Sequence, residues 1–340
     1  MKVCYSEAHR QHNPPFEVFD GGLRVPYLES PDRMDRILEA LRKTDWAEVM
    51  EPKDFGLAPI YAVHDKGYMD FLASAWTEWL DSEATDKSTL LPATFALRRQ
   101  PQKPTSLLGR AGYYMMDLSA CLVAGTYPAA LAAANCALQA AEMVANGEHA
   151  AFALCRPPGH HAGKDYAAGY CFINNAAVAA NWLSAKGNIA LLDIDYHGCN
   201  GTQDIFYDRA DVLTISLHAD PNFEYPYYAG YASETGTGAG LGFHRNFPLQ
   251  KGTTDARYLA ALEEALSLIQ TFAPKYLLVS AGMDIYTDDP LGTIKITTQG
   301  IAEIGKRVSA LDLPTVIVME GGYNNAALGG NIVAFLSSFP

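Results

Sequence analysis

Two adjacent histidines, His160 and His161, end the stretch CRPPGHH at residues 155–161. Neighbouring side chains do not share a helix face, and proline is excluded from helix interiors and central strands, so the pair should lie on a rigid loop. Such a loop can direct both imidazoles into one pocket, where they could transfer protons near neutral pH. Loop packing is the simpler alternative for a histidine pair considered alone.

A second polar group follows the apolar run IALLDI, where Asp195 and His197 flank a single residue. Asp284 follows another apolar run, in SAGMDIYTDD. One imidazole and two carboxylates can hold a catalytic metal and leave a position open for water. Asp193 and Asn200 lie beside these residues and could orient the two histidines through hydrogen bonds. A loop-capping carboxylate and a structural histidine are the alternatives.

Tyr323 follows Gly321 and Gly322 after the run TVIVME. The two glycines leave the backbone free to turn the ring inward. A phenol in that position could donate a hydrogen bond to an oxyanion that develops opposite the metal. Tyrosine is also common in protein cores, so this role depends on the other motifs. His218 and His64 have no second signal, and we expect them to be structural.

Each of these polar groups follows an apolar run of strand length. Near-continuous hydrophobic runs predict strands that are buried on both faces, and helical patterns separate them. The alternation predicts an α/β fold with a single, mainly parallel sheet and helices on both faces. The polar residues should therefore meet at the carboxyl ends of the strands. The predicted strands are 150–155, 188–194, 211–217, 275–281 and 314–320, with a short one in 1–7, and the predicted helices are 129–147, 175–187, 256–272 and 299–311.

The composition is that of an ordinary globular protein, with 49% hydrophobic and 19% charged residues. No apolar run is long enough to span a bilayer, and MKVCYSEAHR lacks a signal-peptide core, which predicts a cytoplasmic protein without a membrane partner. The formal net charge of −13 argues against nucleic-acid binding and weakly favours a cationic ligand. No CxxC pair occurs, so we expect reduced thiols at Cys4, Cys121, Cys136, Cys155, Cys171 and Cys199.

Seven motifs together resemble the histone deacetylase superfamily, and most closely its bacterial acetylpolyamine amidohydrolases. In chain order they are CRPPGHHA, GYCFINNAAVAA, LLDIDYHGCNGTQDIFY, LTISLHAD, ETGTGAGLGFHRNFPL, SAGMDIYTDDPLG and VMEGGY. The resemblance implies one deacetylase domain over residues 1–340 with the arginase/deacetylase fold. The aperiodic stretch at about 81–112 would be an inserted loop that narrows the active-site mouth and helps to form a homodimer.

The resemblance also assigns roles to the polar residues. It implies His161 as general base, His160 as the second member of the pair and Tyr323 as the group that polarises the carbonyl. Asp193 would hydrogen-bond to His160, and Asn200 to His161. One zinc ion would be held by Asp195, His197 and Asp284, and a potassium or sodium ion by Asp193, Asp195, His197, Ser216 and Leu217.

The implied reaction removes the acetyl group from an N-acetylated amine, most simply an acetylpolyamine or a similar small acetylated alkylamine. Tyr170 and Tyr225 match positions that line the substrate tunnel, and Phe19 is a further candidate. An apolar, aromatic slot suits a methylene chain.

The chain departs from the family pattern at Cys199, where His-x-Gly-Asn-Gly normally has glycine. The residue count is unchanged, so the metal ligands stay in register, but the backbone near Asn200 could shift and lower the activity. The thiol could also ligate zinc, since sulfur suits that metal. A tolerated small side chain is the simpler interpretation.

A second departure concerns the distal ammonium of a polyamine, which family members should hold with carboxylates near the mouth. The stretch from Arg98 to Arg110 contains Lys103 and no acidic residue. This weakens the preference for polyamines, although Asp117 and Glu224 could replace the missing acids.

Three alternatives follow from the sequence. An acetyl-lysine peptide deacetylase would need a more open mouth. A catalytically weak protein that binds acylated amines is suggested by Cys199 and opposed by the complete set of ligands and histidines. An arginase-like enzyme with two metals would need carboxylates where Cys199 and Tyr286 stand.

Overall fold

A computed structural model describes residues 1–19, 22–97 and 102–339. Within these ranges, a parallel sheet has the order β4–β1–β5–β10–β9–β6–β7–β8, and β2 pairs with β3 in an antiparallel hairpin. The predicted fold class is confirmed. The strands are β1 Lys2–Cys4, β2 Glu17–Phe19, β3 Leu23–Val25, β4 Glu48–Met50, β5 Ala150–Ala153, β6 Ile189–Asp193, β7 Val212–Ala219, β8 His244–Leu249, β9 Tyr276–Ala281 and β10 Thr315–Met319.

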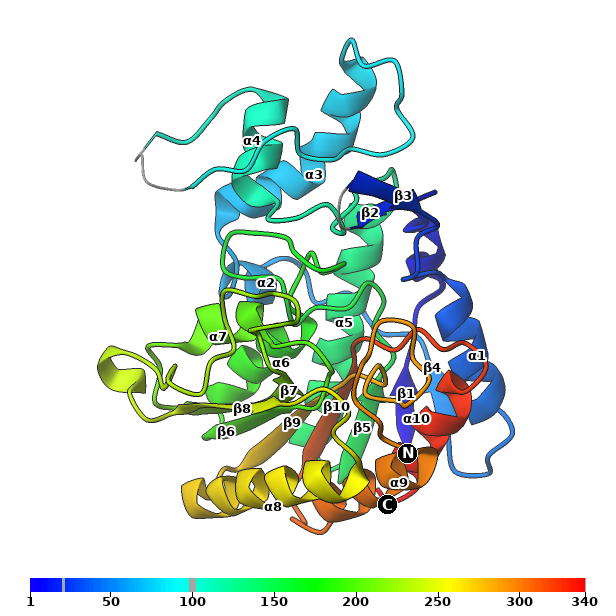
Figure 1. Cartoon of the computed structure of the whole chain (residues 1–340), viewed down its shortest axis with the longest axis vertical. Coiled ribbons are helices and arrows are strands. Elements are labelled where there is room, and N and C mark those ends of the chain that lie inside the picture. Colours follow the sequence, from blue (N-terminus) through cyan, green and yellow to red (C-terminus); the bar gives the residue numbers. More distant parts are fainter. Residues whose placement is uncertain (20–21, 98–101, 340) are drawn as a thin grey trace.

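Helices cover both faces of this sheet (Figure 1). Two short 3-10 turns, Glu7–Gln11 and Gly238–Gly240, occur among the described residues in addition. None of the described helices is long and apolar enough to cross a membrane. The α-helices are α1 Asp32–Leu41, α2 Ala58–Tyr61, α3 Lys66–Asp81, α4 Leu107–Tyr114, α5 Thr126–Ala145, α6 Asn175–Ser184, α7 Asn200–Phe206, α8 Asp255–Phe272, α9 Thr298–Ser309 and α10 Leu328–Leu336.

The central strands are those that the apolar runs predict. β5, β6, β7, β9 and β10 are buried along their whole length, as expected for strands covered by helices on both faces. The sequence did not indicate the two edge strands, β4 and β8. In β8, three of the six residues are only partly buried, as expected for an edge strand that pairs with β7 alone.

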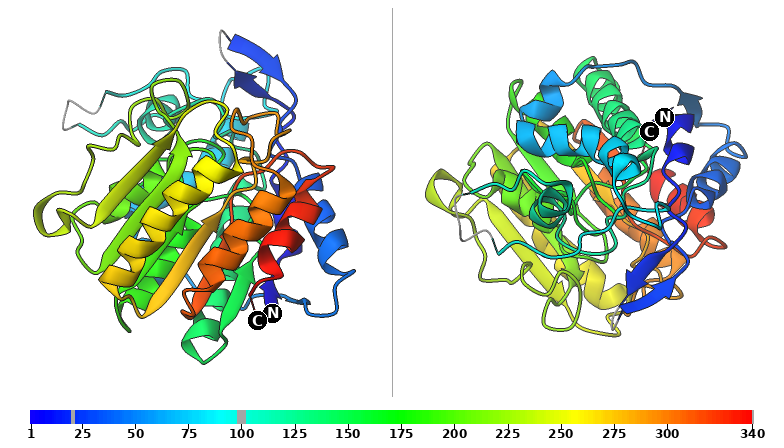
Figure 2. Two further views of the ribbon diagram at one scale, coloured as in Figure 1. Left: turned by 60° about the horizontal axis from the view of Figure 1, so that its bottom comes forward. Right: turned by 90° about the horizontal axis from the view of Figure 1, so that it is seen from above.

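Helices α8, α9, α10 and α1 lie side by side on one face of the sheet (Figure 2, left). Their apolar residues form one buried cluster with the strand side chains that point to this face. In α9 the buried residues Ile301, Ile304 and Val308 recur at helical spacing, which places a single apolar stripe against the sheet.

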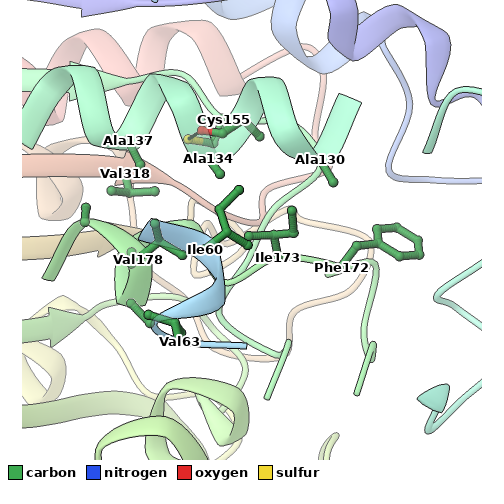
Figure 3. Packing of buried hydrophobic residues seen from close by; sticks show 14 of the residues in the cluster. Ile60, Val63, Ala130, Ala134, Ala137, Cys155, Phe172, Ile173, Val178 and Val318 are labelled. Atoms are coloured by element: carbon green, nitrogen blue, oxygen red, sulfur yellow. Dashed lines mark hydrogen bonds between the residues drawn. The ribbon is translucent and has the colours of Figure 1, made fainter. Parts of the chain in front are cut away.

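The opposite face is covered by α5 and α6, which contact each other and the sheet. Small side chains let α5 approach closely: Ala130, Ala134 and Ala137 are buried (Figure 3). Gly147 follows this helix with φ 111°, a left-handed conformation that glycine adopts freely. The predicted end of the helix at Gly147 is therefore close to the observed one.

The predicted inserted loop is wrong at its carboxyl end, where residues from Leu107 onward form α4. The Ser106 side chain accepts a hydrogen bond from Gly109 N and caps this helix, a local signal that the scattered prolines obscure. Helix α4 lies with α3 and the hairpin β2–β3 at the top of the molecule (Figure 1). Arg98 and Arg99, from the basic stretch, lie outside the described residues.

Candidate active site

The carboxyl ends of four strands bring the predicted site residues together. His160 and His161 follow β5, Asp195 and His197 follow β6, and the remaining two residues, Asp284 and Tyr323, follow β9 and β10. Because β5, β10, β9 and β6 are consecutive in the sheet, their terminal loops are neighbours. His161, His197 and Tyr323 border one cavity of about 660 Å³.

The loop that carries the histidine pair is fixed by a buried carboxylate from another strand. Glu320, which follows β10, accepts hydrogen bonds from Gly159 N at 2.7 Å and from His160 N at 3.2 Å. A side chain on Gly159 would collide with the backbone of Asn175 and Ile173, so glycine is required there. The expectation of a rigid loop agrees with these contacts.

The two histidines have different partners. His160 Nδ1 lies 3.0 Å from Asp193 Oδ2, and His161 Nδ1 lies 2.6 Å from Asn200 Oδ1. Because an amide oxygen only accepts hydrogen bonds, His161 carries its proton on Nδ1 and presents a lone pair on Nε2. The pairing of each histidine with its expected partner is thus present in the geometry.

The charges of the two imidazoles also differ. Burial lowers the pKa of His160, but Asp195 and Asp193 outweigh this effect and raise it to about 10. Burial and the neighbouring His160 and His197 lower the pKa of His161 well below 6.5. His161 is therefore neutral and can accept a proton, while His160 is positively charged.

Asp195, His197 and Asp284 form a compact buried group whose ligand atoms lie within 4.8 Å of one another. His197 Nδ1 lies 3.3 Å from Asp195 Oδ1 and 3.2 Å from Asp284 Oδ2. Burial and the charge of Asp195 raise the pKa of Asp284 to about 7. Two buried carboxylates that repel each other across one imidazole fit a divalent cation, which would compensate both charges.

A second group of potential ligand atoms comprises His160, Cys171 and Glu320. Here the polar atoms already have protein partners: Cys171 Sγ donates to Gly169 O, and Glu320 accepts from the histidine loop and from Ser280. This group holds the loop in place and suits a metal less well than the first.

The Tyr323 ring is turned inward by the conformation that the two glycines allow. Gly322 has φ 121°, and a Cβ atom on Gly321 would lie 2.3 Å from Asp284 Oδ2. Gly321 N also donates to Asp195 Oδ2 at 2.8 Å. The turn after β10 therefore packs directly against two of the candidate metal ligands.

The walls of the cavity are mainly aromatic. The Tyr170 ring lies 5.7 Å from the Tyr323 ring, and the Tyr225 ring lies 4.9 Å from the His161 ring, measured between centroids. Phe19 lines the same cavity from the hairpin, so all three predicted tunnel residues border it. The full lining is Val18, Phe19, Leu23, Phe95, Met116, Asp117, Leu118, Ser119, His161, Gly169, Tyr170, His197, Glu224, Tyr225, Tyr227, Leu291 and Tyr323.

Asp117 and Glu224 are the acidic residues of this lining, and both are engaged by the protein. Asp117 accepts hydrogen bonds from Ser119 N, Ala120 N, Gly169 N and the Tyr225 hydroxyl. These donors occupy the roughly four lone-pair positions of a carboxylate. Glu224 accepts from the Tyr196 hydroxyl at 2.8 Å and from Tyr225 N at 3.0 Å.

Cys199 is buried outside the group formed by Asp195, His197 and Asp284. Burial raises the pKa of its thiol well above the usual value, and the side chains near it are Asp193 and Ser216. The contact between Asn200 and His161 is retained, so the extra side chain has not displaced this residue.

The residues expected to hold a monovalent cation lie together. Asp193 and Ser216 are register partners in the pairing of β6 with β7, and Leu217 is the next residue of β7. Ser216 Oγ lies 2.6 Å from His218 Nδ1, whose ring also contacts Gly230 O. His64 contacts Gly163 O and Asn174 N. His64 and His218 thus have structural partners, as expected.

Four polar residues of the site have no role assigned from the sequence, although Glu320 and Asp289 lie within the motifs VMEGGY and SAGMDIYTDDPLG. Glu17 accepts from the Tyr170 hydroxyl at 2.6 Å, and Glu320 fixes the histidine loop. Arg33 and Asp289 contact the turn that carries Tyr323. All four act across long sequence separations, so no local spacing could reveal them.

Comparisons with known proteins found relatives that cover almost the whole chain. Residues 27–339 match the model of the histone deacetylase domain. Acetylpolyamine amidohydrolase 2 of Pseudomonas aeruginosa is 45% identical, over 100% of this chain and 98% of the relative. The acetylpolyamine amidohydrolase of Mycoplana ramosa is 42% identical, over 99% of this chain and 98% of that relative. A crystal structure of an acetylpolyamine aminohydrolase from Burkholderia pseudomallei superposes with a TM-score of 0.96 at 40% identity, covering 100% of this chain and 98% of that one.

Proposed function

Because this chain belongs to the histone deacetylase family, we propose that it is a zinc-dependent amidohydrolase acting on small N-acetylated alkylamines such as acetylpolyamines. One observation carries the proposal. His161, Tyr323 and the candidate ligand His197 all border the same aromatic cavity, which places a base, a hydrogen-bond donor and a metal position around one acetamide.

Asp195, His197 and Asp284 would hold the zinc ion. When bound, this ion would polarise the acetamide carbonyl and lower the pKa of a water molecule. The buried carboxylates supply the negative charge that a divalent cation requires, and the single imidazole leaves positions open for water and substrate.

His161 is the proposed general base. Asn200 fixes the proton on Nδ1, so Nε2 is free to accept the proton of the attacking water. The Tyr323 hydroxyl donates to the oxyanion that forms when water adds to the carbonyl. Burial raises the pKa of this phenol well above 10, which keeps the hydroxyl protonated and able to donate.

Asp193 and Asp195 face His160 and raise its pKa, which favours the positively charged imidazole. Its charge lowers the pKa of His161 and so makes protonated His161 a stronger acid. That acidity favours delivery of the proton to the amine as the carbon–nitrogen bond breaks. The pair therefore serves both the attack and the departure of the amine.

The aromatic walls of Tyr170, Tyr225 and Phe19 suit an unbranched alkyl chain. The lone pairs of Asp117 are occupied, which leaves Glu224 as the better candidate in the lining for a distal ammonium group. This arrangement favours short acetylated diamines over longer polycations. An acetyl-lysine peptide is the alternative substrate, favoured by the four hydrogen bonds that already occupy Asp117.

Further features of the family are part of the proposal. Asp193, Asp195, His197, Ser216 and Leu217 would hold a potassium or sodium ion near the histidines. The exposed apolar residues Phe95, Leu97 and Leu108 would pack against a second copy of the chain in a homodimer. Residues 1–340 would form one domain. The six buried, unpaired cysteines suit a reducing compartment, in line with a cytoplasmic location.

The first experiment compares acetylputrescine, acetylcadaverine and an acetyl-lysine peptide as substrates of the zinc-loaded protein, with Tyr323→Phe as control. We expect turnover of the diamines that falls sharply in the control. Turnover of the peptide alone would assign the chain to the protein deacetylases. Absence of turnover for every substrate, with zinc bound, would overturn the proposed substrate class.

A further inference from the structure

The geometry points to Asp289 as a positioning residue that holds Tyr323 in its inward conformation through the backbone amides of the turn after β10. This inference rests on the proposed function, because Tyr323 is the proposed oxyanion donor. Asp289 does not border the cavity, so it would act only through the turn.

The contacts of Asp289 are concentrated on two segments of the site. Its Oδ2 accepts hydrogen bonds from Tyr323 N at 2.7 Å and from Asn324 N at 3.0 Å. Its Oδ1 accepts from Leu291 N at 3.0 Å, and Leu291 lines the cavity. One side chain therefore holds the backbone of two residues that line the cavity, Tyr323 and Leu291.

The burial of Asp289 makes these contacts strong. The side chain is only 6% exposed, and a buried carboxylate that accepts backbone N–H bonds gains more from each of them than a neutral acceptor would. The residue cannot turn away to water without breaking all of these contacts. The amides of Tyr323 and Asn324 are correspondingly held on one side of the turn.

The opposite side of the turn is held by Arg33, which is fully buried. Its guanidinium donates to Gly322 O and Glu320 O, both at 2.6 Å, and lies 4.9 Å from the centroid of the Tyr323 ring. The carbonyl groups of the turn thus bind a cation and its amides bind an anion. Asp289 supplies the anionic half of this arrangement.

Positive φ at Gly322 explains why the turn needs such support. Glycine lowers the steric cost of this conformation but gives the chain many other conformations. Without an acceptor for the two amides, the Tyr323 backbone could rotate and carry the hydroxyl away from the oxyanion. A shift of about 1 Å in such a donor is enough to reduce a rate substantially.

The test uses Asp289→Ala and Asp289→Asn, with Asp288→Asn as matched control. Asp288 is the exposed neighbour of Asp289 in the same loop. Asp289→Ala should lower kcat about 10-fold, and no further than Tyr323→Phe does, while KM changes less than threefold. Asp289→Asn keeps one acceptor oxygen and should fall between Asp289→Ala and the wild type. The control should retain the wild-type kcat.

A double variant separates positioning from general destabilisation. If Asp289 acts through Tyr323, adding Asp289→Ala to Tyr323→Phe should change kcat less than threefold, because the hydroxyl it positions is already gone. The inference would be overturned if Asp289→Ala lowered kcat by the same factor in the wild type and in Tyr323→Phe. It would also be overturned if Asp289→Ala left kcat unchanged.

Amide hydrogen exchange gives a readout that needs no substrate. In Asp289→Asn, the amides of Tyr323 and Asn324 should exchange at least tenfold faster, while those of β9 and β10 keep the wild-type rate. An unchanged rate at Tyr323 would contradict the inference. A wild-type protein that deacetylates nothing would defeat the proposed function and leave this measurement valid.

Discussion

At the scale of single residues, the Tyr323 hydroxyl is the donor that the proposed reaction depends on most. Replacing it in Tyr323→Phe removes one oxyanion donor and should lower kcat by about 10²- to 10³-fold with little change in KM. Steady-state kinetics on acetylputrescine would measure this. A higher KM with an unchanged kcat would assign the hydroxyl to substrate binding instead.

Glu17 is a buried carboxyl group that accepts hydrogen bonds from the Tyr170 hydroxyl and from the Leu28 amide. Burial raises its pKa to about 7 in the folded protein, compared with about 4.5 for an ordinary glutamate. The folded state therefore favours protonated Glu17. Its contribution to stability is complete below pH 4.5 and is lost as the pH rises through about 7.

Glu17→Gln should abolish this loss, since glutamine does not ionise. We expect the variant to match the wild type near pH 4.5 and to exceed its free energy of unfolding by about 1–3 kcal/mol at pH 8.5. Urea unfolding at the two pH values measures the difference. Glu264→Gln, on the exposed surface of α8, is the control and should show no such dependence. A variant less stable than the wild type at pH 8.5 would refute the argument.

Cys199 is a residue-scale departure whose side chain fills buried space between Asp193 and Ser216. Its φ of −79° is ordinary for a side chain, so glycine is not needed there. Cys199→Gly should therefore lower the free energy of unfolding by about 1–3 kcal/mol, through lost packing and added backbone freedom. Chemical denaturation would show this, with Cys199→Ala expected to lose less. A stabilised glycine variant would contradict the expectation.

At the scale of elements, the candidate metal group joins two strands, because Asp195 follows β6 and Asp284 follows β9. Zinc binding would add a cross-link between the ends of neighbouring strands. Zinc in roughly 1,000-fold excess over its Kd should stabilise the protein by about 4 kcal/mol, and a chelator should remove this gain. Calorimetry at several zinc concentrations provides the test.

The variants for this metal experiment are His197→Ala and, as control, Asp208→Asn. The first should no longer respond to zinc, whereas the second changes an exposed carboxylate and should respond as the wild type does. An equal response in His197→Ala would move the metal to other ligands, with the group of His160, Cys171 and Glu320 as the first place to look.

Elements also show what the sequence could and could not predict. The buried strands β6, β9 and β10 were evident because strands covered on both faces need continuous apolar runs. The edge strand β8 and helix α4 were missed, since one mixes polar and apolar residues and the other begins among prolines. The contacts of Asp289 with Tyr323 and of Glu17 with Tyr170 depend on how distant elements pack, which no local pattern encodes.

At the scale of the whole molecule, exposed apolar residues occur on helix α4 and in the segment that precedes it. Leu97 is 77% exposed and Leu108 is 47% exposed. Exposed apolar side chains of this size suit an interface with another protein chain. Leu97→Glu combined with Leu108→Glu should weaken self-association at least tenfold by placing charges in the proposed dimer interface. Sedimentation velocity over a range of concentrations measures it.

The control for this experiment is Leu241→Glu, because Leu241 is 65% exposed and follows the 3-10 turn Gly238–Gly240, in a different segment from Leu97 and Leu108. It should leave the association unchanged. A wild-type chain that sediments as a monomer at every concentration would rule out the proposed homodimer.

The place of β10 in the sheet has a consequence for how the protein is made. This strand is the last of the sheet in chain order, yet it pairs with β5 on one side and β9 on the other, near the centre. A chain synthesised only as far as β9 has a gap in the middle of its sheet and lacks Tyr323. Fragments that end before β10 should therefore be inactive and prone to aggregate through the unpaired edges of β5 and β9.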